Sequence, residues 1–384
     1  MFFFHNNQNI DLLENSRSDE DVNILVGING SGKSTYLNEI AKHHLKRGKT
    51  VIAIANTIYD KFTIKGSRAK LLKSSHGKNI AKHSIKEVLK VLESDNIKAF
   101  FNLSNVFNYI NLQPRIEFKI NNLNPDFRDI IINTSAFNKE EIEDLLYFLN
   151  RSYDYSLIEN EGKFILDFDK NNEFDAFRNV FFLKVLNYES KLKKLKILKD
   201  IEITLFKNNH SFPLNHASSG ELTLIASLMY ISVNITDSSI ILIDEPENSL
   251  HPKWQVEYVK KLSELFYFYQ PKIIIATHSP LVINGAELNI TNVNIFKGSS
   301  FGQFNKQNKE LKNVEEIYDN YFDLTTPENR FISQLVIEKF NLLSEGKISY
   351  TNFQNILYDL IQNSYDNQQK QALSGILELA SKYS

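Results

Sequence analysis

The stretch Gly27-Ile28-Asn29-Gly30-Ser31-Gly32-Lys33-Ser34-Thr35 follows the pattern G-x-x-x-x-G-K-[ST], which is typical of loops that bind nucleotide phosphates. Because its glycines lack a Cβ atom, successive backbone N–H groups can turn toward one phosphate. Lys33 adds a positive charge for the β- and γ-phosphates, and the Ser34 hydroxyl is a ligand for Mg²⁺. We therefore expect nucleotide contacts from Asn29, Gly30, Ser31, Gly32, Lys33, Ser34 and Thr35.

The residues on either side of this loop argue against the alternative of a glycine-rich turn without a ligand. The run Val22–Val26 is apolar and predicts a buried strand that ends at the loop. After the loop, Leu37, Ile40, Ala41 and Leu45 recur at helical spacing. A helix that begins here points the positive end of its dipole at the same phosphates. The order of strand, loop and helix predicts an α/β fold.

Composition limits the class of protein. The 384 residues suffice for one large domain or two smaller ones, and 12% aromatic residues can fill a substantial core. A balance of 44 basic and 46 acidic residues does not favour a general nucleic-acid coat protein. With no cysteine in the chain, disulfides and thiol catalysis are excluded. The longest apolar run, around Leu222–Val233, is shorter than the roughly 20 residues of a membrane span, so we expect a cytoplasmic protein without a membrane partner.

Two further apolar runs end in polar residues that can bind a ligand or take part in catalysis. Ile240–Ile243 leads into Asp244 and Glu245, and Ile273–Ala276 leads to His278. Buried parallel strands present such residues at their carboxyl edge, where α/β folds bind ligands. Asp244 is suited to hold Mg²⁺, and Glu245 to orient and deprotonate an attacking water. We predict Lys33, Glu245 and His278 as the catalytic groups, with His278 donating a hydrogen bond to the γ-phosphate.

The segment Ser218-Ser219-Gly220-Glu221 precedes an apolar helix and allows two interpretations. Ser218 and Glu221 have the spacing of a capping box. The same geometry leaves N–H groups and the Ser219 hydroxyl free to face a phosphate, and the two interpretations are compatible.

We divide the chain into four parts. Residues 1–115 and 200–289 carry the motifs, 116–199 is expected to be a helical insertion, and 290–384 a helical C-terminal region that contacts a partner. Within the insertion, 140–149 and 175–186 have helical periodicity. Asp167 and Asp169 could bind a metal there, but alternation around them favours a strand.

Two stretches are rich in lysine. Residues 61–98 hold ten basic and three acidic residues, and 191–199 holds five lysines. A solvated face is the favoured interpretation, and a surface for DNA or RNA is the alternative.

The motif order resembles the ABC-type ATPases, with a Walker A loop, a signature (Ser218–Glu221), a Walker B strand, a D-loop (Asn248–His251) and an H-loop histidine. Ser218-Ser219-Gly220-Glu221 and Glu247-Asn248-Ser249-Leu250-His251-Pro252 are similar to the RecF/SMC/OLD-like branch rather than to transporters. Within that branch the chain resembles standalone ATPases of bacterial antiphage modules, whether OLD-like, Septu-like or retron-associated. The resemblance implies a P-loop NTPase fold of the ABC head type that uses ATP and Mg²⁺.

The resemblance also implies a head-to-tail homodimer that holds two ATP molecules in its interface. The phosphate loop of one subunit would face Ser219 and Gly220 of the other, and hydrolysis through Glu245 would open the dimer. Gln113 is a candidate for the Q-loop glutamine, which contacts Mg²⁺, and His251 stands where the family usually has aspartate. The insertion is too short for a coiled-coil arm.

Three functions remain open from the sequence. The first is an ATP-driven switch that controls a separately encoded effector, a nuclease, because no nuclease motif follows His278. The second is a repair or recombination ATPase that binds DNA directly through the lysine-rich stretches. The third, a transporter subunit, is disfavoured by the signature.

Overall fold

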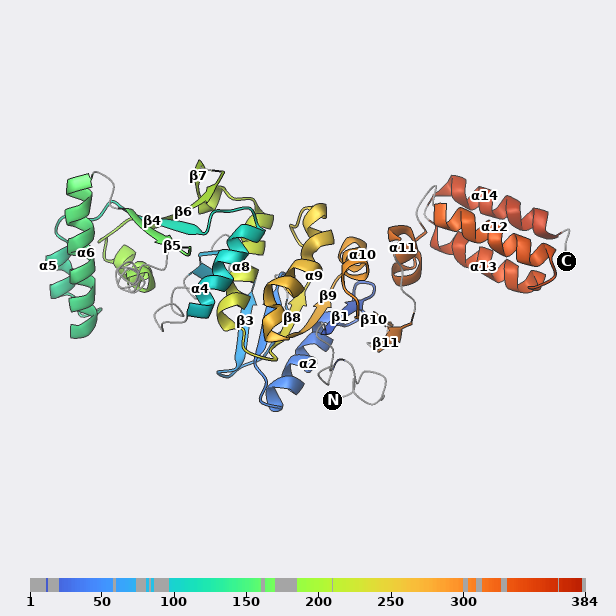
Figure 1. Cartoon of the computed structure of the whole chain (residues 1–384), viewed down its shortest axis with the longest axis horizontal. Coiled ribbons are helices and arrows are strands. Elements are labelled where there is room, and N and C mark those ends of the chain that lie inside the picture. Colours follow the sequence, from blue (N-terminus) through green and yellow to red (C-terminus); the bar gives the residue numbers. More distant parts are fainter. Residues whose placement is uncertain are drawn as a thin grey trace.

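The computed structural model describes most of the chain, and its architecture is built around one large sheet (Figure 1). The described residues are 12, 21–57, 60–73, 81–82, 84–85, 97–159, 163–169, 185–208, 210–299, 303–308, 313–325, 330–364 and 366–381.

The central sheet has seven strands, of which six are parallel and the edge strand β11 is antiparallel. From edge to edge they are β11 (Phe304–Gln307), β10 (Val293–Gly298), β1 (Asp21–Val26), β9 (Lys272–Ala276), β8 (Ile240–Asp244), β2 (Val51–Ala55) and β3 (Ala69–Lys73). β1, β2, β8 and β9 are buried along their whole length, as expected of strands covered on both faces. The predicted α/β class is confirmed.

Helices cover both faces of this sheet. On one face α2 (Lys33–Lys46) packs Leu37 and Ile40 against inward side chains of β1, β2 and β8. The opposite face carries α4 (Ile97–Tyr109), α8 (Ser219–Asn234), α9 (Pro252–Phe266) and α10 (Pro280–Asn289). α9 and α10 pack so closely that a Cβ at Gly285 would lie 1.9 Å from Val256 O. These two layers fix the strand ends from which the site is built.

Within the described residues, the helical insertion expected at 116–199 also contains two strands, one of them beside Asp167, as the alternation there favours. A second sheet of four antiparallel strands runs through it, in the order β5 (Lys163–Asp167), β4 (Arg115–Asn121), β6 (Asp200–Lys207) and β7 (His210–Pro213). Buried Ile116 and Phe118 alternate with less buried residues in β4, which is a strand period rather than a helical one. Helices α5 (Phe127–Asn133) and α6 (Lys139–Glu159) connect β4 to β5. The predicted helix at 175–186 lies largely outside the described residues.

The C-terminal region is not helical throughout, because 293–307 supplies β10 and β11. β10 was missed because polar residues interrupt its apolar run, although Ile295 and Phe296 are buried beside β1. After α11 (Val314–Phe322), helices α12 (Arg330–Ser344), α13 (Tyr350–Asn363) and α14 (Asn367–Ala380) form a bundle with a separate core. The bundle lies at one end of the molecule, and α5 and α6 at the other (Figure 1). No helix in the described ranges has the length and apolar character needed to cross a membrane.

Candidate ATP site at the carboxyl edge of the sheet

The phosphate loop joins the end of β1 to the first turn of α2. Gly27, Gly30 and Gly32 have φ angles of 148°, 84° and 88°, which residues with a side chain rarely adopt. A Cβ at Gly27 would also lie 2.9 Å from Ser31 Oγ. The loop therefore depends on glycine for its shape, as a backbone cradle for phosphate does.

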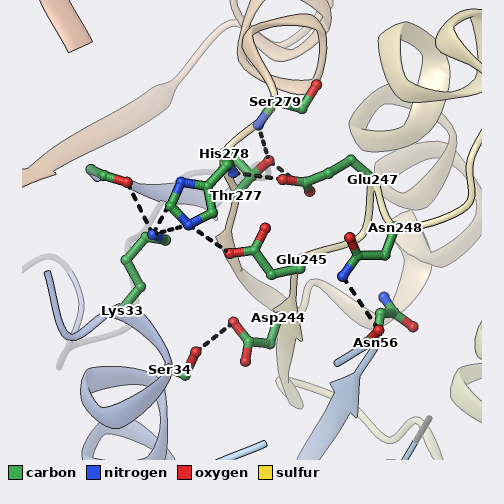
Figure 2. A network of polar contacts seen from close by, with 11 residues as sticks. Lys33, Ser34, Asn56, Asp244, Glu245, Glu247, Asn248, Thr277, His278 and Ser279 are labelled. Atoms are coloured by element: carbon green, nitrogen blue, oxygen red, sulfur yellow. Dashed lines mark hydrogen bonds and ion pairs between the residues drawn. The ribbon is translucent and has the colours of Figure 1, made fainter. Parts of the chain in front are cut away.

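The Lys33 side chain is buried beneath this loop and points at the end of β9 (Figure 2). Its ammonium donates to Gly27 O at 3.0 Å and lies 2.6 Å from His278 Nε2. Burial lowers the Lys33 pKa, and the nearby carboxylates of Glu245 and Asp244 oppose that shift. Gly27 O and the His278 ring nitrogen are uncharged acceptors, which an anionic phosphate would outcompete.

Ser34 and Asp244 meet at the base of the site. Ser34 Oγ donates to Asp244 Oδ1 at 3.1 Å, and Asp244 is fully buried at the end of β8. Asp244 Oδ2 is buried too, and within the described part of the chain it has no hydrogen-bond partner. Burial raises the Asp244 pKa to about 6. An unpartnered carboxylate oxygen beside a serine hydroxyl fits the oxygen ligands of Mg²⁺, so these two residues could hold the ion.

Glu245 follows the last residue of β8 and has a left-handed backbone, with φ 53°. Its N–H donates to Ala276 O at 2.8 Å, while Oε1 lies 3.1 Å from His278 Nε2. Burial, together with the neighbouring Glu247 carboxylate, to which a protonated Glu245 donates a hydrogen bond, raises the Glu245 pKa to about 9. The predicted base therefore faces Lys33 and His278 (Figure 2).

The sequence motifs point to no role for Glu247, yet its carboxylate joins the ends of β8 and β9. Oε1 accepts the His278 N–H at 2.6 Å, and Oε2 accepts the Thr277 hydroxyl at 2.8 Å (Figure 2). The acidic residue two positions after Glu245 is visible in the sequence. The sequence does not show that Glu247 bonds to Thr277 and His278, because a contact between two strand ends depends on the order of the strands in the sheet.

His278 connects the two halves of the site. Burial and the charge of Lys33 lower its pKa, so the ring is neutral at pH 7 and can accept from Lys33. It shares a cavity of about 420 Å³ with Asn29, Glu245 and Glu247, and Tyr318 of α11 also lines it. The structure thus brings together Asn29, Lys33, Ser34, Asp244, Glu245 and His278.

The signature segment lies elsewhere on the chain's surface. Ser218 Oγ accepts the Glu221 N–H at 3.2 Å and Glu221 accepts the Ser218 N–H at 3.0 Å, so the predicted capping box is present. Ser219 and Gly220 border a hollow of about 630 Å³ with the D-loop, including His251. A Cβ at Gly220 would lie 2.3 Å from Ser249 O, so signature and D-loop pack directly together. None of the residues lining this hollow lines the cavity of Glu245 and His278.

Gln113 lies in another hollow, of about 240 Å³, with Arg115, Asp167 and Asp169. Its N–H donates to Phe206 O at 2.8 Å, which ties it to the second sheet. Asp167 ends β5, as the alternating pattern favours. A role for Gln113 in Mg²⁺ binding stays a prediction.

Comparison with known families adds to this geometry. Residues 48–284 match the family described as "AAA domain, putative AbiEii toxin, Type IV TA system". The chain belongs to this family. The match begins after the phosphate loop and spans the signature, the Walker B strand and His278. The resemblance to retron-associated and Septu-like ATPases is also confirmed, as the relatives show.

Three curated relatives are similar over part of their length. The "Retron Vc95 probable ATPase" of Vibrio cholerae serotype O1 biovar El Tor is 31% identical over 181 residues, covering 40% of this chain and 34% of the relative. The "Retron Ec83 probable ATPase" of Escherichia coli is 30% identical, covering 38% and 28%. The "Septu protein PtuA" of Bacillus mycoides (strain KBAB4) is 32% identical, covering 30% and 16%. The chain thus matches about a third or less of the length of these relatives.

A solved Smc head domain from Pyrococcus furiosus is 14% identical, with a TM-score of 0.28, covering 79% of this chain and 93% of that one.

Proposed function

We propose that this protein binds and hydrolyses ATP, dimerises on ATP and acts as a nucleotide switch that controls a separately encoded effector, a nuclease, in antiphage defence. The observation that carries the proposal is the convergence of Lys33, Ser34, Asp244, Glu245 and His278 at one sheet edge. Phosphoryl transfer needs positioning and charge compensation more than covalent chemistry, and this set supplies both.

Each side chain has a definite task in the proposed reaction. Lys33 exchanges Gly27 O and His278 for the β- and γ-phosphates. Ser34 and Asp244 hold Mg²⁺, which when bound offsets the negative charge of the phosphates. Glu245 orients the attacking water and takes its proton once the charge of bound Mg²⁺ lowers its raised pKa, and His278, freed from Lys33, donates to the γ-phosphate.

A division of the motifs within one chain supports the proposed dimer. The cavity beside the phosphate loop contains no signature residue, and Ser219 and Gly220 border a separate hollow. A second copy placed head-to-tail would bring its Ser219 N–H and hydroxyl to the γ-phosphate side of that cavity. ATP then completes the interface, and loss of the γ-phosphate weakens it.

The effector part of the proposal rests on the sequence resemblance to ATPases of antiphage modules and on what the described residues lack. In the described ranges no cluster of three or more His, Cys, Asp or Glu residues could hold a metal ion, as a metal-dependent nuclease centre would. The C-terminal bundle, with its separate core, is our candidate for the partner contact.

The test is to purify the Glu245→Gln protein from its native host with ATP and Mg²⁺ present, beside a Lys33→Ala protein as the matched control. A nuclease recovered in fixed ratio with Glu245→Gln, and not with Lys33→Ala, supports the switch. DNA recovered alone would favour the repair function instead, and a permease would favour transport.

A further inference from the structure

The parallel strands of the central sheet begin on the side opposite the ATP site, which we call the amino edge. Four separate segments that lead into these strands form a second surface there. Backbone hydrogen bonds connect them in order: Ser238 N–H to Tyr269 O at 2.8 Å, Ile240 N–H to Thr50 O at 2.9 Å, and Val51 N–H to Arg68 O at 2.9 Å. These residues lead into β9, β8, β2 and β3, which are neighbours in the sheet. With strands about 4.8 Å apart, the row extends ~14 Å along this amino edge.

One half of this surface is strongly basic. Arg68 contacts Gly48 O, which joins the loop before β3 to the end of α2. The segments that this contact joins carry five cations. The segment at residues 235–239, between α8 and β8, adds one exposed carboxylate, Asp237. The cations are Lys46, Arg47, Lys49, Lys65 and Arg68, of which all but Lys49 are exposed. We call these five residues the basic edge.

The other half presents aromatic rings to solvent. Phe268 is 92% exposed and Tyr267 is 45% exposed, in the short helix η4 (Tyr267–Tyr269) that leads to β9. Their ring centroids lie 6.0 Å apart at an interplanar angle of 75°. A phenylalanine side chain this exposed leaves most of its apolar surface in water, where a partner could cover it.

We propose that this amino edge binds single-stranded nucleic acid. The basic edge supplies the charge that a phosphate backbone requires, and Phe268 and Tyr267 supply faces on which unpaired bases stack. Bases inside a duplex cannot reach such faces, so the combination favours a single strand. The site lies at the end of the strands opposite Asp244 and His278, so it is separate from ATP hydrolysis and goes beyond the function proposed above.

The experiment measures binding of a fluorescein-labelled 20-nucleotide thymidine oligomer by anisotropy, from 50 to 200 mM salt. The variant Lys46→Glu/Lys65→Glu should bind at least tenfold more weakly. It should also reduce the slope of log K against log salt by about 1.4, since each single-strand phosphate contact contributes roughly 0.7. Phe268→Ala should weaken binding about 5- to 150-fold and leave that slope unchanged.

The matched control is Lys194→Glu/Lys199→Glu, which reverses two exposed lysines of the 191–199 stretch. It should bind like the wild type, and circular dichroism should show the same melting curve for all variants. The proposal is overturned if the wild-type protein does not bind at 50 mM salt, or if the control pair loses binding while the basic-edge pair does not. It is also overturned if a duplex of equal length binds as tightly and Phe268→Ala has no effect.

Discussion

Replacing Glu247 by glutamine removes one negative charge and changes almost no volume, so it isolates what this carboxylate does. Both of its oxygens accept, one from the His278 N–H at 2.6 Å and one from the Thr277 hydroxyl at 2.8 Å. A glutamine amide offers one acceptor and turns its NH₂ group toward the other donor. One hydrogen bond to a charged group is lost, which is worth about 1.5–3 kcal/mol.

Because that bond positions the backbone of His278, the cost should appear when His278 acts on the γ-phosphate. At 1.36 kcal/mol per factor of ten, we expect kcat for ATP hydrolysis to fall about 10- to 150-fold. The KM for ATP should change little, since Lys33 and the phosphate loop are untouched. Phosphate release under saturating ATP measures kcat, and calorimetric titration with a non-hydrolysable ATP analogue measures affinity.

Glu264→Gln is the matched control, because this glutamate is half exposed on α9 and pairs with the surface lysines Lys260 and Lys261. It should keep the wild-type kcat. A Glu247→Gln protein with unchanged kcat would refute the positioning role. A fall in ATP affinity as large as the fall in kcat would instead place Glu247 in nucleotide binding.

Three further predictions concern binding, packing and pH. Lys33→Ala should abolish ATP binding in a calorimetric titration, because the β- and γ-phosphates lose their buried cation. In urea unfolding, Gly285→Ala should lower the free energy of unfolding by about 1–3 kcal/mol or more, since the new Cβ would lie 1.9 Å from Val256 O. Gly375→Ala is the control: its Cβ would meet open space, so it should raise that free energy by about 0.5–1 kcal/mol. Burial lowers the His44 pKa to about 4, so below pH 6.5 the unfolded chain binds a proton at this residue that the folded chain does not. The difference should cost about 3 kcal/mol of stability by pH 4. His44→Gln should remove that part of the pH dependence.

The sequence was sufficient to predict the buried central strands β1, β8 and β9 and the groups at their ends. Continuous apolar runs such as Ile273–Ala276 are typical of parallel strands, and the phosphate loop has few alternative structures. β3 and β10 were missed because polar residues dilute their apolar runs, so the signal that marks a buried strand is weak. The alternation around Asp167 favoured a strand of the second sheet, but the pairing of that sheet was missed, since its strands lie far apart in the chain and pair only in three dimensions.

Within the site, the residues at strand ends were predicted individually, whereas their contacts were not. The 3.1 Å contact of Ser34 with Asp244 and the 2.6 Å contact of Lys33 with His278 depend on β1, β9 and β8 being neighbours. No local pattern specifies that order. The role of Glu247 was invisible for the same reason.

The central claim is that Glu245 is the base of an ATPase whose site is completed by a second copy. The most direct measurement is the molar mass of the Glu245→Gln protein by light scattering with ATP and Mg²⁺, with phosphate release followed in the same sample. The account predicts a dimer that retains ATP and releases no phosphate above background. Turnover at the wild-type rate, or a monomer with ATP bound, would contradict it.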